Sequence, residues 1–379
     1  MNVPAVIAGY ARSPYLFARK GGFVNMRPDD IAGQVVKGLI DKLDIDPALI
    51  EDIIAGCAYP EGEQGSNVAR IIGFLAGLPD SVAGVTVNRF CGSSMTSVHM
   101  AAASMQMGAG EAFLCVGLES MTRVPNGGFT PSPNPHLMES FPQIYVTMGQ
   151  TAENVARRYG ISRADQEQMA VASHRKAAAA QAAGRLAGEI VPIATPDGII
   201  AQDGCIRPTT NAEQLASLKP AFDPQGSVTA GTSSPLTDGA TALLVCSEQF
   251  AQRHGLKIFA RIKAVAVAGC PPEIMGMGPV YATRKALQRA GLAIGDMDVI
   301  ELNEAFASQG LACARELGMD IERVNIDGGA MAIGHPLGAT GARITGKAAE
   351  ILSRDGGRFA LATQCIGGGQ GIATILEAV

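Results

Sequence analysis

The sequence predicts a layered α/β fold made of two similar halves. Short apolar runs that suit buried strands alternate with segments whose apolar residues recur at helical spacing, the pattern of sheets covered by helices. Residues 46–54 also resemble residues 293–300, and residues 239–245 resemble residues 371–377. This internal repeat predicts that one architecture occurs twice in the chain.

The composition fits a compact protein with a large core. The 379 residues are 47% hydrophobic and 17% charged, and this length suits two or three packed units. A net charge of -5 and the absence of a Lys/Arg block argue against a nucleic-acid partner. The eight cysteines form no C-x-x-C pair, so we expect neither a metal site nor a disulfide framework, and we predict reduced thiols.

No targeting or membrane segment is expected. The opening MNVPAVIAGYARSP has no basic region followed by an apolar run, and no segment has the length and apolarity of a membrane span. These features predict a soluble protein in a reducing compartment, most simply a bacterial cytoplasm.

The first half is expected to alternate strands and helices. Residues 3–8 suit a short buried strand, and residues 31–40 recur at helical spacing behind a favourable helix start that contains Pro28. A strand is expected at residues 83–87, followed by a helix over residues 95–105. The continuous apolar run at residues 112–116 suits a strand covered on both faces.

The second half is expected to repeat this alternation. Strands are predicted at residues 300–302, 324–326, 359–363 and 372–376, and residues 344–351 recur at helical spacing.

Between the halves lies a segment of different character, roughly residues 121–234. It has a Pro/Gly-rich start and an Ala-rich helix predicted at residues 166–187. We interpret it as an insertion into the first half, because a loop of this length usually carries function or has its own structure.

Cys91 is the first candidate for chemistry. In the string Asn88-Arg89-Phe90-Cys91-Gly92-Ser93-Ser94 it follows a predicted strand and opens a predicted helix. The unpaired N–H groups and partial positive charge of a helix N-terminus favour a thiolate over a thiol and can hold an oxyanion. A small buried core residue is the alternative interpretation, and it is the common one for an isolated cysteine.

His335 lies in a glycine-flanked loop, Gly334-His335-Pro336-Leu337-Gly338. Little side-chain bulk would obstruct a ligand there, and the other four histidines lie in helical or exposed contexts. His335 is therefore the best candidate for a base that activates a thiol. A histidine bonded to loop backbone is an equally simple alternative.

Two more segments carry polar groups after buried strands. Asn303-Glu304-Ala305-Phe306 is expected to begin a helix, where the Asn303 amide could orient a water or a carbonyl, although asparagine is also a common N-cap. Cys365, a candidate second acid/base, precedes four glycines in five positions, residues 367–371. Such a turn lets backbone N–H groups approach a reacting carbonyl, or is simply a tight turn. It lacks a P-loop lysine and a dinucleotide fingerprint, so phosphate binding is not expected there.

Four motifs together resemble the signature blocks of the thiolase family, in the same order and at similar spacing. They are residues 88–94, 303–306, 328–338 and 365–371. The resemblance covers essentially the whole chain. It implies the thiolase fold, in which two βαβαβαββ halves stack in a five-layered αβαβα arrangement with a loop domain inserted in the first half.

The resemblance also implies domain boundaries. Residues 1–120 and 237–258 would form the N-terminal half, residues 121–236 the inserted CoA-binding loop domain, and residues 259–379 the C-terminal half. Coenzyme A would be a substrate, with no bound cofactor and no metal.

Each motif acquires a role from the resemblance. Cys91 would be the acyl nucleophile, His335 its activator, and Cys365 the acid/base that handles the substrate α-carbon and the thiol of CoA. Asn303 and His335 would hold one oxygen site, and the backbone N–H groups of Cys91 and Gly367 a second. CoA would then attack acyl-Cys91, which gives ping-pong kinetics.

Five further residues are implied along the CoA path. Arg207, Phe222 and Ser234 would contact CoA, and Met148 and Met275 would lie near the pantetheine and the acyl chain. Arg207 could stack on adenine or meet a phosphate, and a solvated surface arginine is an equally simple interpretation.

Two departures from short-chain biosynthetic members bear on the substrate. Thr147-Met148-Gly149 stands where many of them have a histidine before Met-Gly, and Asp327 replaces a frequent asparagine. The first departure favours a degradative 3-ketoacyl-CoA thiolase of fatty acid β-oxidation, which forms acetyl-CoA and a shortened acyl-CoA. Residues 273–279 and 365–374 also resemble that branch.

Three other functions stay open: an acetoacetyl-CoA thiolase (acetyl-CoA C-acetyltransferase) that condenses two acetyl-CoA, a non-catalytic CoA- or lipid-binding member of the fold, and a cysteine-dependent hydrolase. The presence of all four motif residues disfavours the second, and the third needs no second cysteine or enolate site. The resemblance further implies a homodimer or homotetramer, or a complex with a multifunctional β-oxidation subunit.

Overall fold

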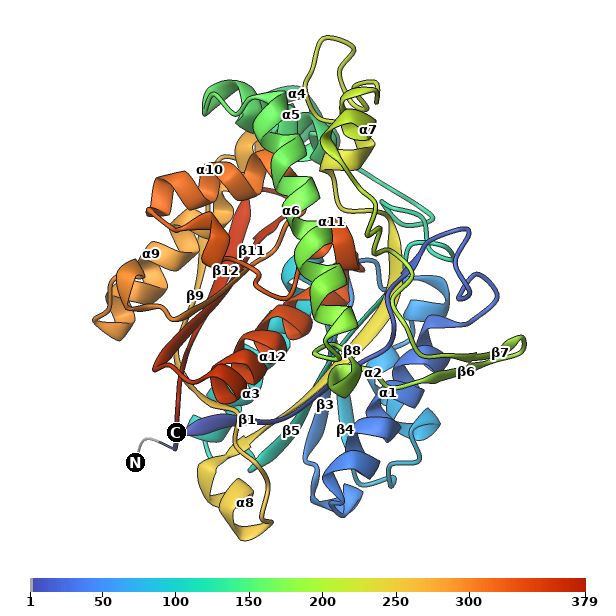
Figure 1. Ribbon diagram of the computed structural model, residues 1–379. Coiled ribbons are helices and arrows are strands. Elements are labelled where there is room, and N and C mark those ends of the chain that lie inside the picture. The colour runs from blue at the N-terminus through green and yellow to red at the C-terminus, as the bar shows by residue number, and fades with distance from the viewer. Residues whose placement is uncertain (1–2) are drawn as a thin grey trace.

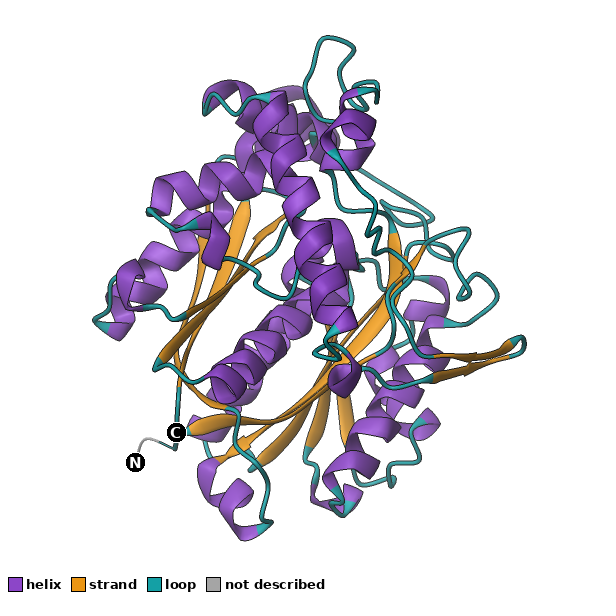
Figure 2. Cartoon of the chain, in the orientation of Figure 1, coloured by secondary structure: helices purple, strands orange, loops and turns teal. Residues whose placement is uncertain are grey.

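The computed structural model describes residues 3–379, which fold into two sheet-and-helix halves packed around a shared pair of helices (Figure 1). Met1 and Asn2, where the predicted N-terminal half begins, lie outside the described residues. Within residues 3–379 ten strands join into one sheet, and β6 and β7 form a separate ribbon (Figure 2).

The strands are β1 (Ala5–Arg12), β2 (Leu16–Phe17), β3 (Asp52–Gly56), β4 (Ala83–Val87), β5 (Ala112–Ser120), β6 (Ile193–Thr195), β7 (Gly198–Ile200), β8 (Thr237–Ser247), β9 (Ala260–Gly269), β10 (Val299–Leu302), β11 (Phe359–Ile366) and β12 (Gln370–Glu377). The helices are α1 (Pro28–Leu43), α2 (Val68–Leu75), α3 (Ser93–Gln106), α4 (Pro135–Ser140), α5 (Met148–Arg158), α6 (Arg163–Ala182), α7 (Ala212–Ala216), α8 (Glu248–Arg253), α9 (Gly278–Ala290), α10 (Ala307–Leu317), α11 (Ala330–Ile333) and α12 (Leu337–Asp355). None of these helices combines the length and the apolarity needed to cross a membrane.

The sheet repeats one strand order in its two halves. Hydrogen bonding runs β4-β3-β5-β8-β1 in the first half and β10-β11-β12-β9 in the second, and a short antiparallel pairing of β1 with β9 joins them. β4, β3 and β5 are parallel, as are β10 and β11, whereas the last two strands of each half add antiparallel. This matching order confirms the predicted duplication.

One predicted strand is wrong. Residues 324–326 make a single parallel bridge, from Val324 to Ile300, where the repeat would place the counterpart of β4. Asn325 has a left-handed φ of 51°, which interrupts an extended backbone. Its side chain instead bonds both backbone groups of Leu302, accepting the N–H at 2.9 Å and donating to the carbonyl at 2.8 Å.

Helices cover the outside of both halves and fill the space between them. α1 packs on β8 and β5 of the first half, and α9 packs on β9 and β12 of the second. Between the halves α3 and α12 lie side by side, with α3 on β3 and β5 and α12 on β5, β8 and β11 (Figure 1). The order is therefore helix, sheet, helices, sheet, helix, as the family resemblance implies. All nine residues of β5 are buried, as its apolar run predicts for a strand covered on both faces.

The segment between β5 and β8 contains α4 to α7 and the β6–β7 ribbon. The Ala-rich helix α6 begins earlier than predicted, at Arg163, because the Ser162 side chain caps it by accepting the Asp165 N–H. It also ends earlier, at Ala182, and Gly184 just after it has a left-handed φ of 74°. α6 packs on α10 and α11, so this segment lies against the second half as well as the first.

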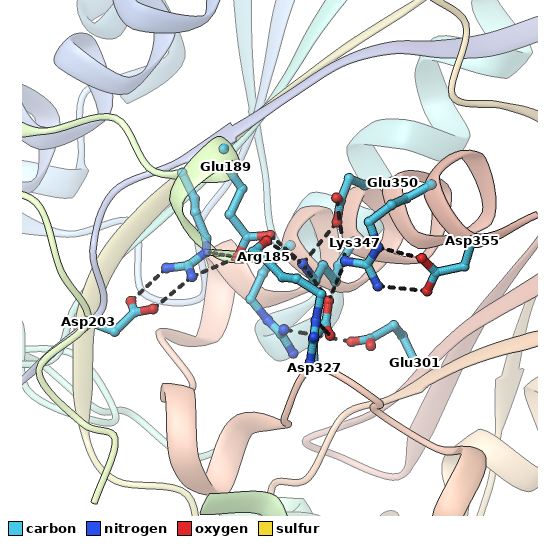
Figure 3. A network of polar contacts seen from close by, with 12 residues as sticks. Arg185, Glu189, Asp203, Glu301, Asp327, Lys347, Glu350 and Asp355 are labelled. Carbon is cyan, nitrogen blue, oxygen red and sulfur yellow. Dashed lines mark hydrogen bonds and ion pairs between the residues drawn. The ribbon is translucent and has the colours of Figure 1, made fainter. Parts of the chain in front are cut away.

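A buried ionic network joins that segment to α12 (Figure 3). Lys347 on α12 is 2% exposed, and its Nζ lies 3.0 Å from Glu189, 3.1 Å from Asp327 and 2.9 Å from Glu350. Glu189 also accepts from Arg12 of β1, at 2.7 Å. The network therefore ties a strand of the first half, the inserted segment and a helix of the second half. Asp327, which the sequence marks as a departure, is buried in this network.

Candidate active site

Cys91 lies in a strained turn just before α3. The 3-10 turn η3 (Phe90–Gly92) contains Cys91, and α3 begins at Ser93. Phe90 has a left-handed φ of 44°, which is unfavourable for a bulky residue and persists only where the surroundings impose it. Among those surroundings, the Gln364 side-chain amide donates to the Cys91 carbonyl, and Ser93 Oγ donates to the Phe90 carbonyl at 2.6 Å. These bonds fix the direction of the Cys91 side chain.

The Cys91 thiol is partly buried and protonated in the resting protein. Burial raises its pKa to about 11, and a hydrogen bond from the backbone N–H of Gly367 offsets only part of that rise. The expectation that the helix N-terminus makes Cys91 a thiolate is therefore wrong for the free protein, because the cost of desolvating the charge is larger. A base must take the proton before the sulfur can attack.

Alkylation of Cys91 by iodoacetamide should accelerate as the pH rises. With the pKa raised to about 11, the thiolate fraction should grow about tenfold per pH unit between about pH 7 and 10. Quenched time points analysed by peptide mass spectrometry give the rate, with N-acetylcysteine as the reference thiol. A rate that levels off at lower pH than the reference would show that the resting thiol is activated.

Cys365 and Gly367, from β11 and the turn after it, are neighbours of the Cys91 sulfur. Cys365 on β11 is 1% exposed. Burial is the larger cause, and the neighbouring Cys91 sulfur the smaller one, that raise the pKa of Cys365 well above its usual value. The glycine turn is required after it, because Gly369 has a φ of 79° and a Cβ there would stand 2.3 Å from the Cys270 carbonyl oxygen. The turn brings the Gly367 N–H to the Cys91 sulfur.

His335 and Asn303 meet as a second pair. Asn303 Nδ2 lies 3.4 Å from His335 Nε2, and Thr340 Oγ1 lies 2.6 Å from Nδ1. The Thr340 hydroxyl also donates to the Pro336 carbonyl, so it accepts the Nδ1 proton and leaves the Nε2 lone pair toward Asn303. Burial, together with the charge of Arg343, lowers the pKa of His335 to about 3, so the imidazole is neutral.

The helix predicted to begin at Asn303 begins at Ala307 instead. Residues 303–306 are not helical, and the Asn303 N–H continues the pairing of β10 with β11 by donating to the Thr363 carbonyl at 3.0 Å. Asn303 is therefore no N-cap. Its Oδ1 is buried and has no hydrogen-bond partner among residues 3–379, so this atom is available to a ligand or a water.

The packing of strands and helices brings the Cys91–Cys365 pair and the His335–Asn303 pair to one place. α12, which follows His335, packs on η3 and therefore on Cys91. β10 and β11 are parallel with Leu302 opposite Thr363, so Asn303 and Cys365 emerge at the same edge of the sheet. The site thus forms where the carboxyl ends of neighbouring strands meet the turn before α3.

Glu119 is a site residue that sequence reasoning missed. It is the last residue but one of β5, is 2% exposed, and accepts the N–H of Ala58 at 2.8 Å and of Gly338 at 2.9 Å. It thereby ties the loop after β3 to the start of α12. The sequence pattern that could have pointed to Glu119 is a carboxylate near the end of a strand with a continuous apolar run. Thr340 and Gln364 were also missed, and no local pattern marks them.

The residues implied along the CoA path lie at different depths. Met275 is buried in one apolar cluster with Cys365, and Met148 packs against that cluster. Phe222 is 43% exposed and packs edge-on against Phe306, with ring centroids 5.9 Å apart.

Ser234 and Arg207 make contacts outside that apolar cluster. The Ser234 N–H donates to the Ala305 carbonyl at 3.0 Å, so Ser234 borders the Asn303 segment. Arg207 is exposed, and its guanidinium lies over the Phe17 ring, 5.0 Å from the centroid. Phe17 pairs with Thr237, whose Oγ1 accepts the His335 N–H at 3.1 Å, so Arg207 reaches the His335 loop only through two intermediates.

A duplicated α/β fold in which a cysteine bonds a glycine turn, with a neutral imidazole and an amide at the same edge of the sheet, defines a class of acyl-transferring enzymes that work through a thiol. The chain belongs to the thiolase family. Residues 5–249 match the family model of the thiolase N-terminal domain, and residues 256–378 match that of the thiolase C-terminal domain.

Individual relatives agree with the family assignment. The chain is 45% identical to the 3-ketoacyl-CoA thiolase of Bacillus subtilis, over 98% of this chain and 99% of that protein. It is 48% identical to the 3-ketoacyl-CoA thiolase of Pseudoalteromonas translucida, over 100% of both. The crystal structure of the Bacillus anthracis acetyl-CoA acetyltransferase matches with a TM-score of 0.92 and 36% identity over 100% of both chains.

Proposed function

We propose that this chain catalyses thiolytic cleavage of a 3-oxoacyl-CoA by CoA, giving acetyl-CoA and a shortened acyl-CoA, with ping-pong kinetics through acyl-Cys91. The observation that carries the proposal is that the Cys91 sulfur accepts the Gly367 N–H with Cys365 as a neighbour, while Asn303, paired with the neutral His335, lies at the same edge of the sheet as Cys365. The relatives from Bacillus subtilis and Pseudoalteromonas translucida, both named 3-ketoacyl-CoA thiolase, support the degradative direction.

In the first step the Cys91 sulfur adds to the 3-oxo carbonyl while His335 Nε2 accepts its proton. A neutral imidazole with its Nδ1 proton bound to Thr340 is in the state that can do so. The N–H groups of Cys91 and Gly367 would hold the oxyanion, and one such donor is worth about 3–4 kcal/mol in the transition state.

Collapse of the adduct breaks the bond between carbons 2 and 3 and leaves acyl-Cys91 and the enolate of acetyl-CoA. The Asn303–His335 pair would stabilise the enolate oxygen, and Cys365 would give its proton to the enolate carbon. Burial keeps Cys365 protonated, which is the form that can donate. In the second half-reaction Cys365 takes the proton of the CoA thiol, CoA attacks acyl-Cys91, and His335 returns its proton to the leaving sulfur.

Brief incubation with acetyl-CoA should leave an acetyl group on Cys91. Trapping the free thiols and sequencing the peptides by mass spectrometry locates the label among the eight cysteines. Label on another residue, or no label, would contradict the proposed nucleophile.

Condensation of two acetyl-CoA by the same residues is the second function. It has less support, because identity to the acetyl-CoA acetyltransferase is 36% whereas identity to the two 3-ketoacyl-CoA thiolases is 45% and 48%. Comparing cleavage rates on acetoacetyl-CoA and on longer 3-oxoacyl-CoA substrates separates the two functions.

The proposal extends to assembly and location. The family resemblance implies a homodimer or homotetramer, alone or with a multifunctional β-oxidation subunit, and the cysteine usage supports a cytoplasmic location. Eight free cysteines fit a reducing compartment. Light scattering on the purified protein tests the assembly.

A further inference from the structure

Arg343 and Glu301 form a buried pair. Glu301 lies at the margin of the ionic network (Figure 3). Arg343 on α12 is 1% exposed and Glu301 on β10 is 0% exposed, and Nη1 lies 3.7 Å from Oε2, too far for a hydrogen bond. Both Glu301 oxygens, and Nε and Nη2 of Arg343, lack a hydrogen-bond partner among the described residues. Contacts within residues 3–379 therefore satisfy this pair poorly, unlike the rest of the network.

Stability does not explain such a pair. Burial raises the pKa of Glu301 to about 8, more than Arg343 and Lys347 lower it. A carboxyl whose pKa is higher in the folded than in the unfolded protein destabilises the fold at neutral pH. Poorly bonded buried charges are commonly no better for stability than apolar residues of the same size. Residues that cost stability are expected where function needs them.

The pair lies directly behind the imidazole and amide of the site. Residues two apart along a strand point to one face, so Glu301 and Asn303 share a face of the sheet. Residues three apart along a helix also share a face, so Thr340 and Arg343 point the same way from α12. His335 touches Asn303 and Thr340, at 3.4 Å and 2.6 Å. Glu301 and Arg343 thus form a second contact between β10 and α12, and it lies next to the contacts that His335 makes with Asn303 and Thr340.

Resting on the proposed function, we propose that Arg343 and Glu301 are positioning residues for the reaction, which hold β10 and α12 at the separation that aligns Asn303 with His335. The charge of Arg343 also acts directly on His335, where together with burial it keeps the imidazole neutral. The donors and acceptors of the pair that have no partner among residues 3–379 suit ordered water, which would complete the link.

The double variant Glu301→Gln/Arg343→Met tests the proposal, because it removes the guanidinium and the ionisable carboxyl at similar volume. We expect its thermal midpoint to equal or exceed that of the wild type, its KM to stay within about twofold, and kcat to fall about 100-fold, the effect of a misplacement of about 1 Å. A residue with only a structural role would lower stability and leave kcat per folded molecule unchanged. Arg343→Lys, which keeps the cation, should recover part of kcat.

Arg354→Met is the matched control, because it removes a cation of the same helix that pairs with Asp327 and Asp355. It should keep the wild-type kcat. A double variant with wild-type kcat, or one whose kcat and stability fall together, would overturn the positioning role. If the methionine variant does not fold, Glu301→Gln/Arg343→Gln decides by the same comparison. Wild-type protein that takes no acetyl label on Cys91 would instead overturn the proposed function.

Discussion

Replacing Cys91 with alanine should abolish thiolysis while the protein keeps its fold. Alanine has no nucleophile that could carry the acyl group, so kcat should fall by on the order of 10⁴-fold or more. Cys91 is partly buried, and its sulfur accepts hydrogen bonds from backbone N–H groups, those of Gly367 and of Cys91 itself, so the loss of stability should stay near 1 kcal/mol. Acetyl-CoA release from a 3-oxoacyl-CoA measures kcat, and circular dichroism checks the fold.

Cys270→Ala is the control for this experiment. Cys270 is the other partly buried cysteine, and the remaining six are buried. The Cys270 N–H donates to the Gly369 carbonyl through the backbone, which alanine keeps. The control should therefore retain most of the wild-type rate, and residual thiolysis by the Cys91→Ala variant at a comparable rate would rule out Cys91 as the acyl carrier.

Of the substitutions proposed here, Lys347→Met should lower the free energy of unfolding the most. The ammonium lies about 3 Å from each of three carboxylates, two of them, Glu189 and Asp327, almost fully buried. Methionine has a similar shape and no charge, so the carboxylates would stay buried without their main partner. Removing one member of a buried ionic group typically costs about 3–5 kcal/mol. Urea titration at neutral pH measures the change.

The effect of Lys347→Met should shrink in acid. Burial alone would raise the pKa of Glu189 and of Asp327. Lys347 and the neighbouring arginines outweigh burial, so both pKa values lie below their usual range. A carboxyl with a lowered folded pKa contributes stability above its unfolded pKa and loses it as the pH falls through the folded pKa. Wild type and variant should therefore converge as the pH falls through that range.

Lys37→Met is the matched control for the Lys347 variant. Lys37 pairs with Asp41 one turn along α1, and both side chains are about 60% exposed. Exposed pairs of this kind are worth about 0.3–0.5 kcal/mol. Equal shifts of the urea midpoint in the Lys37 and Lys347 variants would contradict a special role for the buried network.

Much of the candidate site was predictable because its signals are local. Cys91 and Cys365 each follow a short apolar run, and His335 and Gly367 stand in glycine-rich strings. Backbone that must approach a reacting group needs small residues, so glycine marks such places without any knowledge of the fold. Asn303 was found from the same kind of pattern, although the helix predicted for it was wrong.

The wrong predictions have a common cause. Asn303 continues a strand because the carbonyl of Thr363 is there to accept its N–H. Residues 324–326 are no strand because the Asn325 side chain bonds Leu302. In both segments a partner distant in sequence overrides the local preference.

The alternation of strands and helices, the duplication and the four motifs can all be found in the sequence, because each depends on periodicity or on residue types a few positions apart. The protonation of Cys91 and the partners of the site residues depend on how the chain packs. Glu119 holds Gly338 from 219 positions away, Gln364 holds the Cys91 carbonyl from 273, and burial sets the pKa of Cys91. Hydrogen-bond partners and desolvation arise where separate elements pack, and no local pattern encodes that packing.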